Sequence, residues 1–401
     1  MSSLEIAFPG YVLDIIARLN GAGYSAYAVG GCVRDSILGR VPHDWDVTTS
    51  AVPERVVSLF SAEPFAVCDI AGIRHGTVLV KHRCGETVEI TTYRSEGKYS
   101  DHRRPDSVDF TDNIEDDLAR RDFTVNAIAA APSDDGETLV VDPFDGISDV
   151  GRKIIRAVGD PNLRFTEDAL RIMRAVRFSS ELGFEIDHET LAAAANLAPT
   201  LSYVSAERIT SELWRMLCGE YFRPCREVLD HALLHICERF YRAFDGDSPP
   251  CNPYVRLALM FPHHDTADSL TTVLRFPSRV VSVVRSLLQT DLPSDIADVC
   301  SIMREFETLL PAVAEYTEYI DDGSACAAIR GARLMECAGD IEKRGLPYKP
   351  SMLAVRGTDL IAVGVPAKFV GRTLDALVRL VAEGSVANEK DALTKCAAQI
   401  N

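Results

Sequence analysis

The sequence lacks several features that would assign it to whole classes of protein. Its 401 residues include eleven cysteines but no Cys-x-x-Cys pair, so neither a zinc site nor a disulfide framework is indicated. The scattered cysteines instead suggest small core residues in a reducing compartment. No apolar run approaches the roughly 18 residues that a bilayer-spanning helix needs. The first residues lack the basic and apolar regions of a signal peptide, so we expect a cytoplasmic protein that makes no membrane contact.

Positive charge is also scarce. The 42 Lys and Arg residues face 59 Asp and Glu residues, which gives a net charge of −17 and argues at first against a polyanionic partner. The acidic excess is concentrated in residues 1–150, which carry 25 acidic and 13 basic side chains. Residues 151–180 instead carry seven basic and three acidic side chains. Nucleic-acid binding would therefore be local, and the charge neither requires nor excludes it.

The order of secondary-structure signals predicts an α+β protein, in which an α/β head is followed by helices. We expect the head at 1–150, a helical neck at 151–225 and a helical body and tail at 226–401. Apolar periodicity and turn residues predict the elements of the head. The expected strands are 24–31, 45–51, 76–82 and 87–94, with the last two paired across the turn 83–86, and the expected helices are 32–39 and 53–61.

Two carboxylates, Asp44 and Asp46, lie two residues apart beside a β-branched run. Such a spacing places both on one face of a strand, where they repel each other unless a cation lies between them. Oxygen ligands of this kind suit Mg²⁺; the alternative is a solvent-facing turn. Glu89, in the predicted strand 87–94, would complete a cluster for two-metal phosphoryl chemistry or would point outward.

A glycine pair, Gly30-Gly31, follows the first predicted strand. It allows a phosphate to approach the start of the next helix, and Arg34 would add a charged contact. The alternative is a turn that only requires a positive φ angle. Further along, Arg121 and Asp122 precede an apolar run that does not need polar groups for its own packing. They fit either a ligand role or a helix cap, whereas the segment 141–146 has the composition of a structural turn.

A basic helix is predicted at 166–178, with Thr166 as its N-cap. Asp168 and Arg171 would then share one helix face and offer an acceptor beside a forked donor, a combination that can read base edges. First-turn capping is the alternative for Asp168. Arg174 and Arg177 continue the three-residue step around the helix and could reach a triphosphate or an RNA backbone.

Six motifs in order give the chain a family resemblance: GGCVRD, DWD, RRDFTVNAIA, DPFDG, EDALRIMRAVRF and SAERITSEL. Together they resemble the class II tRNA nucleotidyltransferases, the bacterial CCA-adding enzymes and their poly(A) polymerase relatives. The resemblance implies a head of the DNA polymerase β type and addition of CCA to the 3′ end of tRNA from CTP and ATP without a nucleic-acid template. Pyrophosphate would leave after in-line attack of the 3′ hydroxyl on the α-phosphate.

The resemblance also implies roles for individual residues. Asp44 and Asp46 match the metal ligands, with Mg²⁺ as the expected cofactor, and Glu89 occupies the position of the third catalytic carboxylate. The remaining matches concern the incoming nucleotide, which would be held or read by Gly31, Arg34, Arg121, Asp122, Asp168, Arg171, Arg174 and Arg177. The C-terminal helices would hold the acceptor arm of tRNA, and no protein partner is expected.

Subtypes within the family leave alternatives open. Residues 95–107 resemble the loop that lets complete CCA-adding enzymes switch from CTP to ATP. An A-adding enzyme, a poly(A) polymerase and a non-catalytic RNA-binding relative are the alternatives. His263, His264 and Asp265 lack the histidine pattern of a phosphohydrolase domain, so we do not expect a second metal site there.

Overall fold

A computed structural model of the chain describes residues 5–96, 108–133, 137–230, 238–245, 249–260, 270–290, 292–319 and 329–400. The chain forms two compact units, Met1–Leu234 and His235–Asn401. The expected boundary at residue 150 falls inside the first unit, and the division into head, neck and body stays a prediction. Within the described ranges, no helix is long and apolar enough to cross a membrane.

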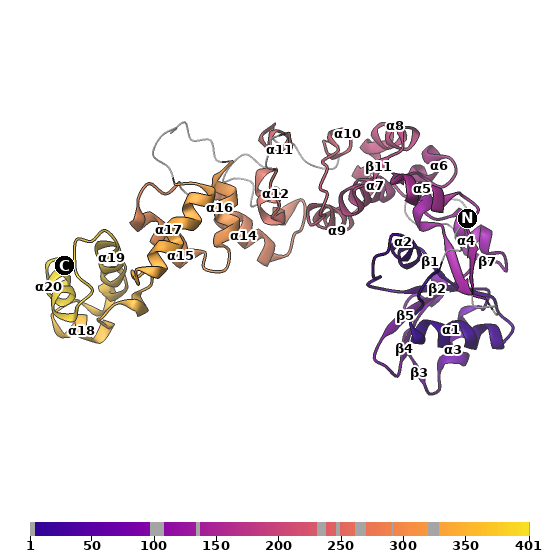
Figure 1. Ribbon diagram of the computed structural model, residues 1–401, viewed down its shortest axis with the longest axis horizontal. Coiled ribbons are helices and arrows are strands. Elements are labelled where there is room, and N and C mark those ends of the chain that lie inside the picture. Colours follow the sequence, from indigo (N-terminus) through magenta and orange to yellow (C-terminus); the bar gives the residue numbers. More distant parts are fainter. Residues whose placement is uncertain are drawn as a thin grey trace. The chain divides into compact units, whose positions relative to one another are not determined.

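A seven-stranded mixed sheet forms the centre of the first unit (Figure 1), and its order is β3-β4-β5-β2-β1-β8-β9. Among the described strands of this sheet, only β2 and β5 pair in parallel. The hairpin predicted across residues 83–86 is confirmed as the β4–β5 pair. The strands are β1 Ala26–Val29, β2 Asp46–Thr49, β3 Phe65–Asp69, β4 Thr77–His82, β5 Thr87–Thr92, β8 Ala129–Pro132 and β9 Thr138–Val141.

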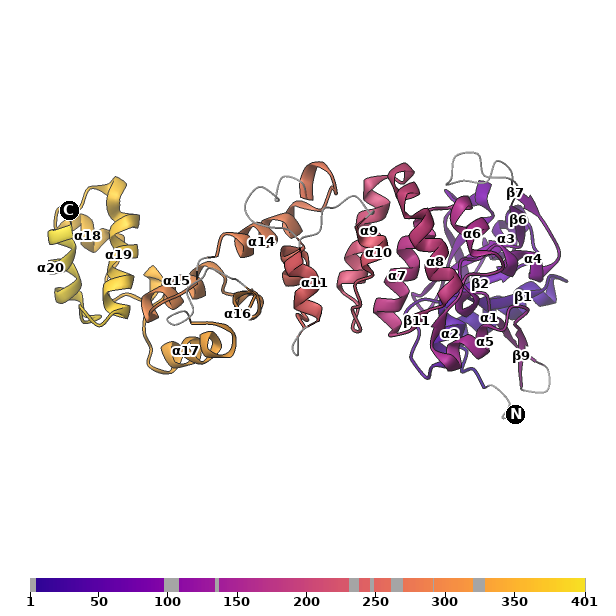
Figure 2. The same ribbon diagram turned by 90° about the horizontal axis from the view of Figure 1, so that it is seen from above.

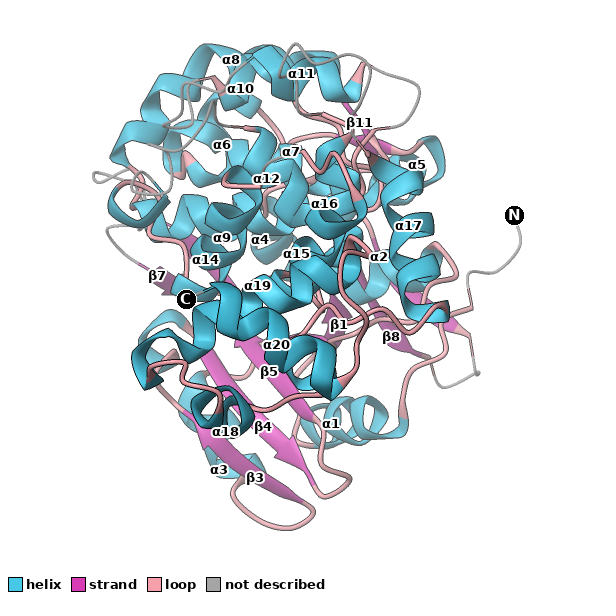
Figure 3. Ribbon diagram, turned by 90° about the vertical axis from the view of Figure 1, so that its left-hand side faces the viewer, coloured by secondary structure: helices cyan, strands magenta, loops and turns pink. Residues whose placement is uncertain are grey.

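Two helices, α1 (Gly10–Gly21) and α3 (Pro53–Phe60), lie along the sheet in Figure 3. Both contact its strands: α1 packs on β1 and β2, and α3 packs on β3, β4 and β5. Helix α3 begins with its proline in the first turn, as predicted, because a proline there loses no helical hydrogen bond. The predicted helix after β1 is also confirmed, as α2 (Gly31–Ile37).

Shorter elements complete the sheet region. They are η1 Ile73–His75, β6 Arg94–Glu96, β7 Val108–Phe110, α4 Ile114–Ala119, η2 Thr124–Asn126 and α5 Gly146–Arg152. Strands β6 and β7 pair at the two ends of the segment 95–107, most of which lies outside the described residues. The segment 141–146 is the structural turn that its composition predicts, because the Asp142 carboxylate accepts hydrogen bonds from the backbone N–H groups of Gly146 (2.7 Å) and Ile147 (2.9 Å).

The rest of the first unit is mostly helical, and Figure 2 shows α7, α8 and α9 beside one another. Helix α7 packs against α9, and α6 packs against α8. The elements are β10 Ile154–Ile155, α6 Pro161–Glu167, α7 Leu170–Leu182, β11 Glu185–Ile186, α8 His188–Leu197, η3 Ala198–Tyr203, α9 Ala206–Leu217 and α10 Arg226–Leu229.

The predicted helix 166–178 has a different start in the structure. Asp160 accepts a hydrogen bond from the Asn162 backbone N–H (2.9 Å) and caps α6, which ends at Glu167. Thr166 lies in the last turn of α6 and is not an N-cap. Asp168 adopts extended backbone angles (φ −139°, ψ 104°), and α7 begins only at Leu170. Asp168 and Arg171 therefore do not share a helix face, because one of them lies outside the helix.

The described part of the second unit is helical, as predicted. A small core packs Leu360, Leu377 and Leu393 together near the C-terminus. His263, His264 and Asp265 lie outside the described residues. The elements are α11 Glu238–Phe244, α12 Pro253–Leu259, α14 Ser278–Leu288, α15 Ile296–Glu305, α16 Leu310–Thr317, α17 Gly331–Lys343, η4 Pro350–Met352, α18 Gly357–Ala362, η5 Ala367–Phe369, α19 Val370–Ala382 and α20 Lys390–Ile400.

The cysteines differ from the expected core positions. Among those that the structure describes, only Cys32 and Cys300 are buried, and none forms a disulfide. Four are exposed: Cys68, Cys84, Cys218 and Cys251. Apolar neighbours in the sequence did not predict burial, because alternate residues of a strand face opposite sides of the sheet and turns carry their residues outward.

Candidate active site

The glycine pair makes a close turn between β1 and α2. Gly30 has a φ angle of +81°, which L side chains rarely adopt, and a Cβ atom there would lie 3.2 Å from Nη1 of Arg121. The backbone angle therefore requires glycine, and a side chain there would also displace the Arg121 guanidinium slightly. Gly31 begins α2, and one turn later Arg34 is buried with its Nη1 donating to Oδ1 of Asn126 (2.6 Å).

The two aspartates come together, although not as two residues of one strand. Strand β2 begins at Asp46, so Asp44 lies in the preceding loop. Trp45 between them is buried and anchors this segment. Asp46 pairs in register with Glu89 on the parallel strand β5, and paired residues of adjacent strands share a face. The loop and the two strands thus bring three carboxylates toward one end of the central strands β2 and β5.

The electrostatics of Asp46 show how closely these acids interact. Asp46 is exposed at the start of β2, but the many protein atoms around its carboxyl group displace part of its hydration. This desolvation, followed by the charge of Glu89 and then that of Asp44, raises the pKa of Asp46 to about 6, against the opposing effect of Arg121. A site that penalises its own negative charge favours a cation.

The donor set fits a hard divalent metal. In the part of the chain that the structure describes, no three His, Cys, Asp or Glu side chains lie close enough to ligate one ion by themselves. Mg²⁺ does not need such a cage, because it is commonly bound by one or two carboxylates together with water and substrate phosphate oxygens. Asp44 and Asp46 supply two carboxylates of this kind.

A cavity of about 590 Å³ opens beside these aspartates. It is lined by eight of the eleven residues that the sequence predicts as site residues: Gly31, Arg34, Asp44, Asp46, Arg121, Asp122, Arg174 and Arg177. Among the residues that the structure describes, six arginines line it, against five Asp and Glu side chains. This described part of the wall is thus close to neutral in a protein whose net charge is −17. Such a wall can accept a polyanion that the chain as a whole would repel.

Asp122 anchors the middle of the arginine set. Its Oδ2 accepts from Nε of Arg174 (2.7 Å), and its Oδ1 accepts from Nδ2 of Asn126 (3.1 Å). Burial of the carboxyl favours its neutral form, but the Arg174 charge and the Asn126 hydrogen bond outweigh burial and lower the pKa of Asp122 to about 2. Since Asn126 also accepts from Arg34, one carboxylate orients two arginines from different elements.

Glu212 on α9 continues this network. It accepts from Nε of Arg177 (2.5 Å) and lies 3.8 Å from Nη1 of Arg174. Arg177, only 1% exposed, also donates to Glu181 (2.5 Å). Sequence reasoning did not nominate Glu212 or Glu181, although the spacing of Glu212 within SAERITSEL was a usable signal. We call the run Arg34, Asn126, Asp122, Arg174, Glu212, Arg177 and Glu181 the arginine network.

An aromatic ring lies beneath the arginines. The guanidinium carbons of Arg34, Arg174 and Arg177 lie 5.4, 5.3 and 3.9 Å from the ring centroid of Phe178. These are cation–π distances, and the ring spaces cations that would otherwise repel one another. Phe178 is not among the site residues that the sequence predicts.

Asp168 and Arg171 do not line the cavity. Asp168 pairs with Arg208 on α9 (2.8 Å), and its Oδ1 accepts from the backbone N–H of Leu170 (3.1 Å). Arg171 pairs with Glu167 (2.6 Å) and donates to the backbone carbonyl of Arg120 (2.8 Å). Both side chains therefore have protein partners in this structure, and their base-reading role stays a prediction.

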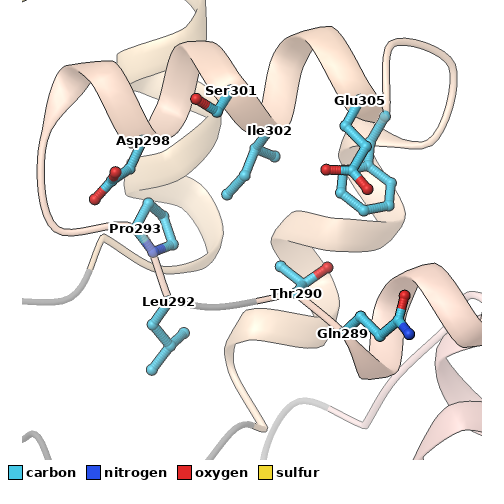
Figure 4. A pocket seen from close by; sticks show the side chains of 9 residues that line it. Gln289, Thr290, Leu292, Pro293, Asp298, Ser301, Ile302 and Glu305 are labelled. Atoms are coloured by element: carbon cyan, nitrogen blue, oxygen red, sulfur yellow. The ribbon is translucent and has the colours of Figure 1, made fainter. Parts of the chain in front are cut away.

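A second cavity, of about 360 Å³, lies between the end of α14 and α15 (Figure 4). Among its described lining residues the charged ones are Asp298 and Glu305, and none of those residues is arginine or lysine. The absence of a cation from this wall disfavours a triphosphate. The cavity beside Asp44 and Asp46 is therefore the better candidate for a nucleotide site.

Comparison with known proteins agrees with this geometry. Residues 26–156 match the family model described as the poly A polymerase head domain, and residues 183–236 match that described as the probable RNA and SrmB-binding site of polymerase A. These matches, the fold and the cavity lined by carboxylates and arginines define a nucleotidyltransferase related to the poly A polymerases.

More specific relatives carry one name. The CCA-adding enzymes of Geobacillus thermodenitrificans and Geobacillus stearothermophilus are 36% and 37% identical to this chain, and each match covers 94% of both chains. The crystal structure of the Bacillus stearothermophilus CCA-adding enzyme in complex with CTP has a TM-score of 0.68 and 32% identity, covering 97% of this chain and 96% of that one. The chain belongs to the family of CCA-adding enzymes, which are tRNA nucleotidyltransferases and need a divalent metal.

Proposed function

We propose that this protein adds CCA to the 3′ end of tRNA from CTP and ATP, releasing pyrophosphate and working in the cytoplasm. The observation that supports the proposal is that one cavity contains both a pair of carboxylates and a set of oriented arginines. Asp44 and Asp46 line it together with six of the seven residues of the arginine network. Nucleotidyl transfer needs both, because the metal ligands and the triphosphate contacts must act on one phosphate.

The metal site follows from the acids. We assign Mg²⁺ to Asp44 and Asp46, with Glu89 beside them on β5. When bound, the ion supplies positive charge to the attacking and leaving oxygens of an in-line displacement. The protein's own contribution is position, since the strand register fixes Asp46 against Glu89 and buried Trp45 holds the loop that carries Asp44.

The arginines hold the triphosphate. Arg34, Arg174 and Arg177 are already oriented by carboxylates, an amide and the Phe178 ring, so little side-chain freedom is lost when the nucleotide binds. Arg121 packs against the Gly30 turn and brings a further cation to the cavity. A fixed array of donors stabilises charge that develops during phosphoryl transfer better than a mobile one does.

Base selection is assigned to Asp168 and Arg171. In the structure each forms an ion pair, with Arg208 and Glu167 respectively. Reading a base edge requires both side chains to exchange these partners for the nucleotide. A base can bind to Asp168 and Arg171 only if its own hydrogen bonds replace those of the two ion pairs.

The test is extension of three RNAs: tRNA lacking CCA, tRNA ending in CC, and an unrelated RNA of similar length. Each is incubated with Mg²⁺ and CTP, ATP or both, and products are resolved at single-nucleotide resolution. We expect CTP alone to add two residues to the first RNA, and ATP alone to add one to the second. If only the tRNA ending in CC is extended, the protein is an A-adding enzyme. If long runs of adenylate are added to the unrelated RNA, it is a poly(A) polymerase.

Matched variants separate catalysis from binding. Asp44→Asn with Asp46→Asn should abolish extension while tRNA still binds in a filter assay. Glu54→Gln, an exposed acid in the first turn of α3, is the control and should extend tRNA at the wild-type rate. Extension by the double variant at ordinary rates would refute the metal assignment, and an inactive wild type that binds tRNA would support the non-catalytic alternative.

A further inference from the structure

The turn between β4 and β5 holds a thiol and an imidazole in contact. Cys84 is exposed in this turn, and its Sγ lies 3.0 Å from Nδ1 of His82, the last residue of β4. The nucleotide cavity includes neither residue, and nothing in nucleotidyl transfer uses them. The pair therefore needs an explanation separate from the proposed function.

The surroundings of His82 fix the role of each ring nitrogen. Nδ1 accepts a hydrogen bond from the backbone N–H of Cys84 (3.3 Å), so it carries a lone pair and also accepts from the thiol. The ring proton then lies on Nε2, which has no hydrogen-bond partner and lies 3.2 Å from a carboxylate oxygen of Asp14 on α1. The imidazole is 7% exposed and packs on Phe65, with ring centroids 5.3 Å apart.

This geometry is that of an activated nucleophile: a thiol, a base that contacts it, and an acid that faces the other nitrogen of the base. We propose that Cys84 is a reactive thiol that forms mixed disulfides with small-molecule disulfides such as oxidised glutathione. His82 Nδ1 takes the thiol proton as Cys84 Sγ attacks one sulfur of the disulfide. The new S–S bond forms, the old one breaks, and the departing thiolate receives the proton.

The modified position would precede the strand end that carries Glu89 beside the catalytic aspartates. Strand β5 begins three residues after Cys84, and its Glu89 pairs with Asp46 at the start of β2. Tyr11 on α1 interacts with both regions: burial, and then the charges of Glu86, Cys84 and Asp44 among others, raise its pKa. A glutathione adduct on Cys84 would therefore place a bulky, charged group near the metal-binding edge.

The test compares two exposed cysteines of the same chain. Cys68, on the adjacent strand β3, is exposed and its sulfur lies 3.9 Å from a backbone carbonyl, so it serves as the internal control. The full chain is incubated with oxidised glutathione at pH 7, and each adduct is followed by peptide mass spectrometry. Because an ordinary thiol is only a few per cent thiolate at this pH, we expect Cys84 to react about tenfold faster than Cys68. Equal rates would overturn the proposal.

Two variants test the mechanism. His82→Gln should lower the rate of adduct formation at Cys84 to that at Cys68. Asp14 is exposed, so Asp14→Asn should leave the fold intact, and it should lower the Cys84 rate severalfold. Buried Cys32 monitors folding, because it should stay unmodified. If Cys32 becomes modified in His82→Gln, that variant has lost its fold and the Asp14→Asn result is used instead. A lower rate of adduct formation at Cys84 in Asp14→Asn supports the proposal, and an unchanged rate overturns it. These readouts are independent of tRNA extension, so failure here leaves the proposed function untouched, and the reverse also holds.

Discussion

Replacing Asp122 by Asn removes the charge at the centre of the arginine network while keeping the shape of the side chain. In the folded chain the pKa of Asp122 falls from an ordinary 3.8 to about 2. Since a pKa difference of one corresponds to about 1.4 kcal/mol, the ionised carboxylate stabilises the fold by roughly 2 kcal/mol at neutral pH. A carboxyl whose pKa is lowered by folding contributes this stability above its unfolded pKa and loses it as the pH falls toward 2. The variant should therefore be less stable than the wild type at pH 7 and 5, and the gap should narrow as the pH falls from 4 toward 2.

Urea unfolding at pH 7, 5, 4 and 3 measures this gap. Tryptophan fluorescence is the appropriate signal, because the only two tryptophans, Trp45 and Trp214, both belong to the first unit. Asp109→Asn, which removes an exposed carboxylate on β7, is the control and should show no such gap. A gap for Asp122→Asn that stays constant from pH 7 to pH 3 would refute the assignment of the stability to the ionised carboxylate.

Three further predictions concern the cavity and its support. Glu212→Gln should raise KM for CTP about tenfold in steady-state extension assays, because the arginines it orients lose a charged acceptor worth about 1.4 kcal/mol; an unchanged KM would contradict this. Arg171→Ala should reduce discrimination between CTP and ATP by about ten- to a hundredfold in single-nucleotide incorporation, and unaltered selectivity would count against base reading. Gly146→Ala would place a Cβ atom 2.2 Å from the Thr124 carbonyl oxygen, so thermal unfolding should show a loss of about 1–3 kcal/mol; an unchanged Tm would contradict the contact.

Local patterns in the sequence predicted local structure well. The β4–β5 hairpin followed from alternation around a turn, and α3 followed from Pro53 at its start. The failure at residues 160–170 was also local. The Asp160-Pro161 pair is a capping signal that begins α6 early, and the break at Asp168 then moves the basic helix to its true start at Leu170.

The sequence predicted most residues of the site but not which of them contact one another. Eight nominated residues line one cavity, because motifs select residue types that a nucleotide needs. Nothing in the spacing indicated that Asp122 would pair with Arg174, 52 residues away, or that Glu212 would hold Arg177 across 35 residues. Such pairings depend on how α7 and α9 pack, which a one-dimensional pattern does not encode.

The arginine network also bears on how this protein can be divided. It begins in α2 and at Asn126, crosses residue 150, and ends on α7 and α9, so neither side has a complete set of partners alone. A fragment ending near residue 150 would leave Asp122 without the cation that favours its ionised form, and the helices would keep a buried guanidinium without that acceptor. The catalytic sheet and the helices behind it should therefore unfold as one cooperative block. For the same reason, exchanging heads between relatives should succeed only when α7 and α9 are transferred with them.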